Sequence, residues 1–254
     1  ASCWYGCGNT SLPNPSTMRM GVTPAGVCVL HQGAMDIGQG ANTVISQIAA
    51  DALGVPVHSL SLIDGDTDLT PDCGKTSASR QTFVSGKAAL LAGQALREVI
   101  LRHGNVSDDA RIVIDGAEVR LVDNATGGSA SIDLSSLPVN VHGYVFMAEE
   151  TYDPPTTPLD QNGQGAPYAV YGYGAQMIEL TVDIGLGQVR LEKMTTSHDV
   201  GRAINPLLVE GQIEGGAAQG IGLALMEDYL PGRTENLHDY LIPTIGDIPR
   251  FEHI

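Results

Sequence analysis

Three separate segments of the chain combine glycines with polar side chains in patterns suited to an anionic or heterocyclic ligand. In the first, Gly38-Gln39-Gly40 lies between a predicted strand and a predicted helix. Glycine allows positive φ and close approach of a ligand to the backbone, and a helix N-terminus favours negative charge. An ordinary strand-to-helix turn has the same residues, so this segment alone leaves both interpretations open.

The second segment places hydroxyl, guanidinium and amide groups at the entrance of a long predicted helix. Its members are Thr76, Ser77, Ala78, Ser79, Arg80, Gln81 and Thr82. Together with the free N–H groups of a helix start, they would form a phosphate cradle. Serine and threonine are also ordinary helix caps, but capping needs only one of them. The surplus leaves a simple cap and a ligand site as alternatives.

The third segment lies inside a predicted helix that is unusually rich in glycine. Its interior glycines are Gly211, Gly215, Gly216, Gly220 and Gly222. Each costs about 1 kcal/mol relative to alanine, so something must approach this helix closely, either a neighbouring helix or a flat ligand. The amide of Gln212 offers a donor and an acceptor, which suits the edge of a pterin-like heterocycle.

Other residues of catalytic type give weaker signals. Ser197-His198-Asp199 are adjacent in sequence, unlike the members of a catalytic triad, and His31 and His198 are predicted to be structural. Cys3 and Cys7 lack a second pair of metal ligands, so free or buried thiols are expected. The acidic run lacks the calcium-loop spacing and predicts a solvated loop, with members Asp64, Asp66, Asp68 and Asp72.

Hydrophobic periodicity supplies the elements that must position these groups. It predicts helices over residues 42–53, from 77 or 79 to 103, and 206–225, and strands over 26–34, 57–63, 111–114, 118–122, 141–149, 176–183 and 188–197. Strand pairs mixed with isolated helices predict an α+β fold, with mixed or antiparallel sheets and long helices packed on them. Residues 105–140 are expected to form a surface excursion, with a candidate boundary giving subdomains 1–140 and 141–254.

Composition excludes several classes of function. The 254 residues contain 13 Lys and Arg against 29 Asp and Glu, a net charge of −16, which argues against nucleic acid and anionic membranes as partners. No apolar run approaches the roughly 20 residues of a membrane span. Because the chain opens at Ala1 without a signal-peptide pattern, either a removed leader or a piece of a larger polypeptide is expected.

Taken in order, the segments resemble the molybdenum-binding subunit of the xanthine dehydrogenase/aldehyde oxidoreductase family. The resemblance rests on HQGAMDIGQG (31–40), TSASRQT (76–82), HDVGRAINPLLVEGQIEGGAAQGIG (198–222) and YLIPTIGDIP (240–249). The opening CWYGCGNT (3–10) is most similar to the branch that hydroxylates N-heterocycles such as nicotinate or purines with a split molybdenum subunit.

This resemblance implies that residues 1–254 form the second lobe of a cofactor-binding domain. The cofactor would be a molybdenum-pyranopterin in its cytosine dinucleotide form, and the reaction the hydroxylation of an N-heterocycle with oxygen from water. It further implies that Ile37, Gly38 and Gln39 contact the cofactor near the metal, that residues 76–82 wrap the pterin and its phosphate, and that Gln212 hydrogen-bonds the pterin. No residue is assigned as a direct metal ligand.

The resemblance also implies partners and a missing catalytic group. The partners would be a first-lobe molybdenum subunit, a 2Fe-2S subunit and an FAD subunit. The expected compartment is the cytoplasm, with a removed export signal as the alternative. The family's general base, a glutamate, is expected beyond Ile254, and Glu252 comes too early in the pattern, so no catalytic residue is assigned. The alternatives are an aldehyde oxidoreductase of the same family and a cofactor-free assembly module without activity.

Overall fold

The computed structural model describes residues 1–8, 13–123 and 127–254, and its α+β architecture confirms the predicted fold class. Asn9 and Thr10 of the 3–10 motif, and residues 124–126 of the 105–140 segment, lie outside the described residues. The chain divides into a larger unit, residues 6–170, and a smaller unit, residues 1–5 with 171–254. This division differs from the boundary considered at residue 140.

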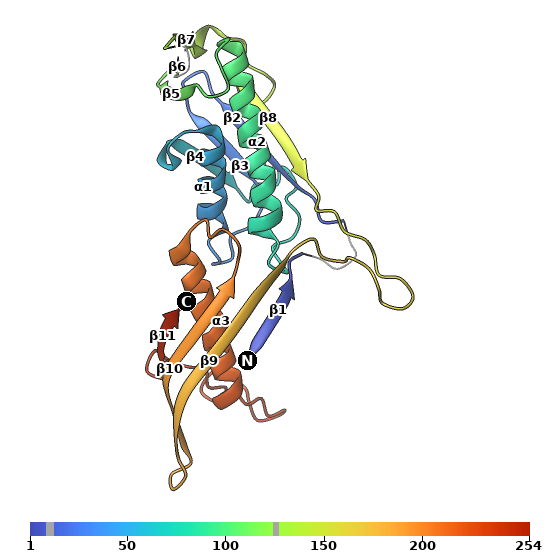
Figure 1. Cartoon of the computed structure of the whole chain (residues 1–254), viewed down its shortest axis with the longest axis vertical. Coiled ribbons are helices and arrows are strands. Elements are labelled where there is room, and N and C mark those ends of the chain that lie inside the picture. The colour runs from blue at the N-terminus through green and yellow to red at the C-terminus, as the bar shows by residue number, and fades with distance from the viewer. Residues whose placement is uncertain (9–12, 124–126) are drawn as a thin grey trace. The chain divides into compact units, whose positions relative to one another are not determined.

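A four-stranded sheet with helices on one face forms the larger unit (Figure 1). The sheet order is β4-β3-β2-β8, with β4 (Leu60–Asp64), β3 (Cys28–Gln32), β2 (Ser16–Val22) and β8 (Phe146–Tyr152). β3 and β4 are parallel and the other pairs antiparallel. Along β2, Met18, Met20 and Val22 point into the core, while Thr17 and Arg19 lie on the opposite face.

Two helices cover the core face of this sheet. α1 (Ala41–Leu53) makes the crossover from β3 to β4, and α2 (Gln81–His103) packs against β2, β8 and α1. The two helices approach closely at Gly93, where a Cβ would lie 2.6 Å from the Cβ of Ala52. The N-terminal ends of both helices and the turn at residues 36–40 all belong to the larger unit.

The expected surface excursion at 105–140 is instead part of the core. β5 (Arg111–Asp115), β6 (Glu118–Val122) and β7 (Ser129–Asp133) form an antiparallel sheet, followed by the short 3₁₀ helix η2 (Leu134–Ser136). One face of this sheet joins the main core through Ile112, Val119, Leu121, Ile132 and Leu134. The prediction was wrong because the surface that a short strand packs against depends on residues distant in the sequence, which the strand's own sequence does not reveal.

The smaller unit is a sheet with one helix packed on it. The sheet order is β1-β9-β10-β11, with β1 (Ser2–Gly6), β9 (Tyr171–Asp183), β10 (Gln188–Asp199) and β11 (Arg250–His253). α3 (Pro206–Leu225) begins as predicted, with the Asn205 side chain accepting from the Leu208 N–H at 3.2 Å. It packs Ala217 and Ile221 against Met194.

Several predicted boundaries are corrected by local hydrogen bonds. Residues 57–59 form the 3₁₀ helix η1 (Val57–Ser59), so the strand begins only at Leu60. β8 begins at Phe146 rather than 141, because the Asn140 side chain closes a turn by accepting from the N–H groups of His142 and Tyr144. The strands β1, β2, β7 and β11 were not predicted at all.

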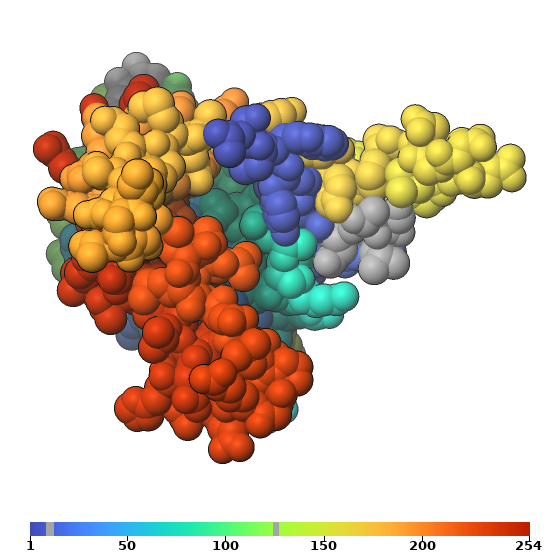
Figure 2. Space-filling view, turned by 90° about the horizontal axis from the view of Figure 1, so that it is seen from below, coloured from blue at the N-terminus to red at the C-terminus, as the bar shows by residue number. Residues whose placement is uncertain are grey.

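Two further features complete the description of the chain. The loop at residues 153–166 projects from the larger unit and is yellow in Figure 2. At the tip of the loop, the Asp160 carboxylate accepts from the N–H groups of Asn162 and Gln164. None of the described helices combines the length and apolar character that crossing a bilayer requires.

Candidate functional site

The turn at residues 36–40 uses the Gln39 side chain to brace its own backbone. The Gln39 Oε1 atom accepts from the Ile37 N–H at 2.7 Å, and its Nε2 donates to the Met35 carbonyl at 3.2 Å. Thr76 Oγ1 donates to the same carbonyl at 2.8 Å. The structure therefore joins the first two predicted segments at Met35, within one unit.

The tip of this turn is open. Ile37 is 75% exposed, and Gly38 adopts φ 109° with no atom within 4 Å of the position that a Cβ would take. The Gln39 amide retains one N–H and one lone pair beyond its two internal hydrogen bonds. This surface is accessible to a ligand from outside the turn.

Asp36 occupies the N-terminus of α1, which sequence reasoning had left free for a ligand. Its carboxylate accepts from the N–H groups of Gly38 at 2.8 Å, Gly40 at 3.3 Å and Asn42 at 3.1 Å. Partial burial raises the pKa of Asp36, but these three hydrogen bonds outweigh burial and hold the pKa below its ordinary value. Because an anion already fills this helix end, a ligand phosphate gains little there.

Arg80 is a buried clamp and not an exposed phosphate ligand. Its side chain is 1% exposed, and its guanidinium donates five hydrogen bonds, to Asn14 Oδ1 and to the carbonyls of Asn14, Pro15, Cys73 and Lys75. A guanidinium has five N–H groups, so none is left for a ligand. This corrects the prediction that Arg80 itself would hold a phosphate.

Gln81 is likewise engaged inside the protein. Its Nε2 atom donates to the Lys75 carbonyl and to Thr76 Oγ1, both at 3.1 Å, and its Oε1 accepts from Ser85 Oγ. Both Gln81 and Arg80 therefore hold the turn before α2 in place instead of facing outward.

The turn supported by Arg80 and Gln81 is strained and presents free donors. Ala78 and Ser79 have φ of 51° and 53°, a left-handed conformation that costs non-glycine residues about 1–2 kcal/mol each. Such strain is concentrated at functional sites. No described residue accepts a hydrogen bond from the hydroxyls of Ser77, Ser79 and Thr82.

The N-cap residue of α2 makes no side-chain cap, and the first turn of α2 contains no acidic residue. At the start of α1, by contrast, the Asp36 carboxylate accepts from the N–H groups of Gly40 and Asn42. Among the described residues, none accepts from the N–H groups of Gln81, Thr82 and Phe83. An uncapped helix start with three free hydroxyls is a favourable arrangement of donors for an anion.

The third predicted segment lies on α3 in the smaller unit. Gln212 is exposed, and its side-chain amide makes no hydrogen bond with any described residue. No atom of the unit lies within 4 Å of a Cβ built at Gly211, Gly215, Gly216 or Gly220, whereas a Cβ at Gly222 would collide with Glu227 and Pro243. Packing within the unit therefore explains only one of the five interior glycines.

A side-chain bridge fixes α3 beside Gln212. The His253 ring on β11 hydrogen-bonds Thr196 Oγ1 on β10 at 2.8 Å and the Glu214 carboxylate on α3 at 3.2 Å. Because Glu214 lies two positions from Gln212, this bridge sets the rotation of the helix that presents the amide. Sequence reasoning missed this bridge, because Thr196, Glu214 and His253 are distant along the chain.

The predicted site residues thus separate into two groups. Ser77, Ser79, Thr82, Gln212 and the tip at Gly38 are exposed, whereas Arg80 and Gln81 support the backbone. Asp36 was missed, although its position just before the glycine turn is a recognisable capping signal. His31 is structural as predicted, hydrogen-bonded to the Leu69 carbonyl and the Tyr144 hydroxyl.

Comparisons with known proteins agree on one family. Residues 1–249 match the family model described as a molybdopterin cofactor-binding domain. The chain is 33% identical over 247 residues to the xanthine dehydrogenase molybdenum-binding subunit of Escherichia coli O157:H7, covering 92% of this chain and 31% of that protein. It is 32% identical over 244 residues to the 6-hydroxypseudooxynicotine dehydrogenase complex subunit gamma of Paenarthrobacter nicotinovorans, covering 91% and 29%.

The fold leads to the same family. The aldehyde oxidoreductase from Desulfovibrio gigas superposes with a TM-score of 0.80 at 28% identity, covering 100% of this chain and 26% of that one. The chain therefore belongs to the molybdopterin cofactor-binding domain family, as its motifs predicted. It spans less than a third of the length of these relatives, whose names include both xanthine dehydrogenase and aldehyde oxidoreductase.

Proposed function

We propose that this chain supplies part of the pterin and phosphate cradle of a molybdenum hydroxylase, as its second lobe. The observation that carries the proposal is the uncapped start of α2, where the free hydroxyls of Ser77, Ser79 and Thr82 surround unpaired N–H groups. The bound molybdenum-pyranopterin supplies the redox centre that hydroxylates the substrate with oxygen from water. The chain itself binds and orients that group.

The donors present match the chemistry of such a cofactor. Phosphate oxygens accept hydrogen bonds from hydroxyls and helix N–H groups, which α2 offers, while Asp36 already neutralises α1. A pterin edge presents both donors and acceptors, which the Gln212 amide matches. Arg80 contributes by holding the 77–79 backbone in its strained conformation, with all of its donors turned inward.

An N-heterocycle is the proposed substrate, with an aldehyde as the alternative. The two relatives above are named for xanthine and for 6-hydroxypseudooxynicotine. The protein of the solved structure is named for aldehydes. Turnover of nicotinate or a purine, compared with benzaldehyde, by the complex that contains this chain separates the two. Faster oxidation of benzaldehyde would overturn the heterocycle assignment.

The proposal extends to the form of the cofactor, the partners and the compartment. We assign the cytosine dinucleotide form, whose second phosphate would need additional donors such as those of the 77–82 turn. The partners would be a first-lobe molybdenum subunit and subunits carrying 2Fe-2S and FAD, since two relatives are themselves named as subunits. The four free cysteines suit the reducing cytoplasm.

A single charge placed at α2 tests the phosphate site. In Ser79→Asp, a carboxylate lies one position before the N-cap Arg80, where it interacts favourably with the helix dipole, and aspartate tolerates the left-handed φ. The unfolding free energy of the chain should therefore rise by about 0.3–1 kcal/mol. The same carboxylate would repel the cofactor phosphate, so the molybdenum content of the complex should fall. Ser129→Asp on β7 is the matched control. Unchanged molybdenum content in Ser79→Asp would contradict the assignment of the phosphate to α2.

A further inference from the structure

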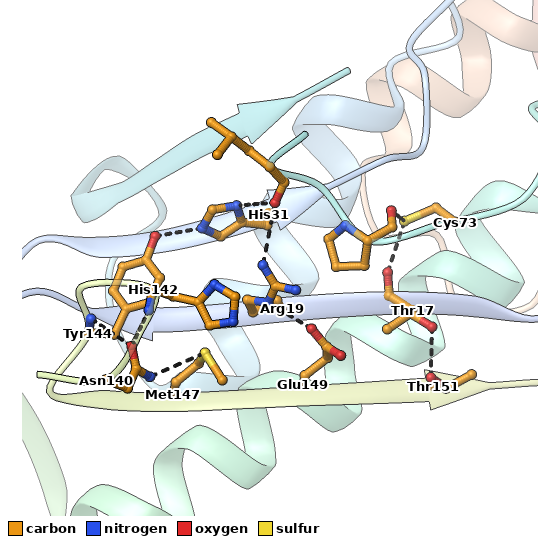
Figure 3. A network of polar contacts seen from close by, with 12 residues as sticks. Thr17, Arg19, His31, Cys73, Asn140, His142, Tyr144, Met147, Glu149 and Thr151 are labelled. Atoms are coloured by element: carbon orange, nitrogen blue, oxygen red, sulfur yellow. Dashed lines mark hydrogen bonds and ion pairs between the residues drawn. The ribbon is translucent and has the colours of Figure 1, made fainter. Parts of the chain in front are cut away.

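The face of the β4-β3-β2-β8 sheet that lies opposite the helices carries a connected polar network (Figure 3). Its centre is His31 on β3, which is 5% exposed. His31 Nδ1 is 3.0 Å from the Leu69 carbonyl, and its Nε2 is 2.5 Å from the Tyr144 hydroxyl. No step of the proposed function uses this histidine.

The partners of His31 determine its protonation. A carbonyl only accepts, so Nδ1 must carry the proton that is shared with Leu69. In the neutral ring Nε2 is then an acceptor, and the Tyr144 hydroxyl donates to it. The Tyr144 ring lies over Gly21, where a Cβ would collide with it, and meets the His31 ring edge-on at 5.7 Å. Tyr144 is thereby held in the position from which its hydroxyl donates to Nε2.

Leu69 begins a segment, residues 69–75, that we name the strap. Arg19 Nη1 also reaches the Leu69 carbonyl, at 3.5 Å, while its Nε pairs with Glu149 at 2.7 Å. Further along, the Asp72 carbonyl accepts from the Thr17 N–H at 3.0 Å. The strap is therefore attached to β2 and β3 from its first residue onward.

Cys73 attaches the strap a second time. Its Sγ donates to the Thr17 carbonyl at 3.0 Å and accepts from the Gly33 N–H at 3.1 Å. Burial raises the pKa of the Cys73 thiol, which keeps it protonated as this arrangement requires. Above Gly33 the strap passes so closely that a Cβ there would collide with the Pro71 carbonyl.

The end of the strap is the part that supports the candidate site. The Cys73 carbonyl accepts from Arg80 Nη1 at 2.6 Å, and the Lys75 carbonyl accepts from Arg80 at 3.0 Å and from Gln81 at 3.1 Å. A shift of the strap would therefore move the acceptors that hold Arg80, and with them the strained turn at 77–79.

We propose that His31 is a positioning residue for the cofactor: its hydrogen bond to Leu69 fixes the strap, and the strap fixes the Arg80 clamp and the donor-rich turn before α2. This inference rests on the proposed function, because it assigns the turn to the cofactor phosphate. The charged groups acting on His31 are Arg19 on β2, His142 in the turn before β8 and Glu149 on β8. β4 places the apolar Ile63 beside it.

Four variants in the complete complex test the proposal. His31→Phe keeps an aromatic ring but removes both hydrogen bonds, whereas His31→Asn keeps a donor toward Leu69. Tyr144→Phe removes only the hydroxyl that donates to Nε2 of His31. His58→Phe, at an exposed histidine in η1, is the matched control. The measurements are the molybdenum content per chain and the hydrogen exchange of the Thr17, Gly33 and Gly74 amides.

In His31→Phe we expect those three amides to exchange about tenfold faster, since one buried hydrogen bond to the strap is lost, and molybdenum content to fall severalfold. Tyr144→Phe should show a smaller change in the same direction, and His31→Asn should recover most of both quantities. His58→Phe should match the wild type.

Three results would overturn the inference. Wild-type exchange in His31→Phe would show that the strap does not depend on His31. Faster exchange with full molybdenum content would show that the strap does not position the cofactor. A wild-type complex without molybdenum would instead remove the proposed function, and this inference with it.

Discussion

At the scale of single residues, the site depends on side chains whose polar atoms are bonded to the protein itself. Arg80, Gln81 and Asp36 use their polar atoms on the protein's own backbone, and the groups left outward are small hydroxyls and N–H groups. Rigid support beneath a strained turn keeps the donors of that turn in place before a ligand arrives, which reduces the entropy lost on binding.

Replacement of Arg80 by lysine tests this support. A lysine ammonium has three donors on a flexible stem and cannot satisfy the five acceptors around the guanidinium. Arg80→Lys should therefore lower the free energy of unfolding by about 3 kcal/mol, because several buried acceptors lose their partners. Urea unfolding measures the change, and Arg102→Lys at the exposed end of α2 is the control. A loss below that of the control variant would contradict the clamp.

The pH dependence of stability tests the state of His31. Burial lowers the pKa of His31, the hydrogen bond to Leu69 and the charge of Glu149 raise it, and Arg19 and His142 lower it, with a net result below the ordinary 6.5. As the pH falls, the unfolded chain takes up this proton first. The contribution of His31 is thus complete above pH 6.5 and declines as the pH falls from 6.5 toward the lowered pKa.

His31→Asn removes this titration, so its unfolding free energy should fall less than that of the wild type between about pH 7.5 and 5.5. Urea unfolding at a series of pH values gives both curves. Parallel curves would mean that His31 binds protons equally in the folded and unfolded chains.

At the scale of elements, the sequence predicted all three α-helices among the described residues. α1 and α2 bury apolar residues at helical spacing, whereas α3 buries few residues and was recognised by its start at Asn205 and Pro206. β2 escaped prediction because its inward residues include Met18 and Met20, which have no strong strand preference, and β11 because it is only four residues long. The inward direction of Arg80 could not be predicted, because two of its acceptors, the carbonyls of Asn14 and Pro15, lie 66 and 65 positions away in the sequence.

The glycines of α3 test what approaches this helix. Since the unit leaves open space at Gly211 and Gly215, alanine should stabilise the helix by about 1 kcal/mol per position. If the cofactor or the first lobe lies against this face, the same substitutions should lower molybdenum content. Gly222→Ala, where a Cβ collides, should destabilise instead. Stabilised Gly211→Ala and Gly215→Ala variants with full molybdenum content would leave these glycines without a role in binding.

At the scale of the whole molecule, the chain exposes large apolar side chains despite its net charge of −16. Among them are Val141, Ile184, Leu186, Leu207, Leu223 and Ile245. We propose that partners in the complete enzyme cover part of this apolar surface. This agrees with the proposal that the chain acts as one lobe of a larger enzyme, since it spans 31% of the length of its Escherichia coli relative.

Metal analysis of the native complex that contains this chain tests the central claim most directly. We predict molybdenum in stoichiometric amount with the chain, together with a pterin that is released on denaturation. A complex that retains the first lobe but contains no molybdenum would contradict the account and would favour a non-catalytic assembly module.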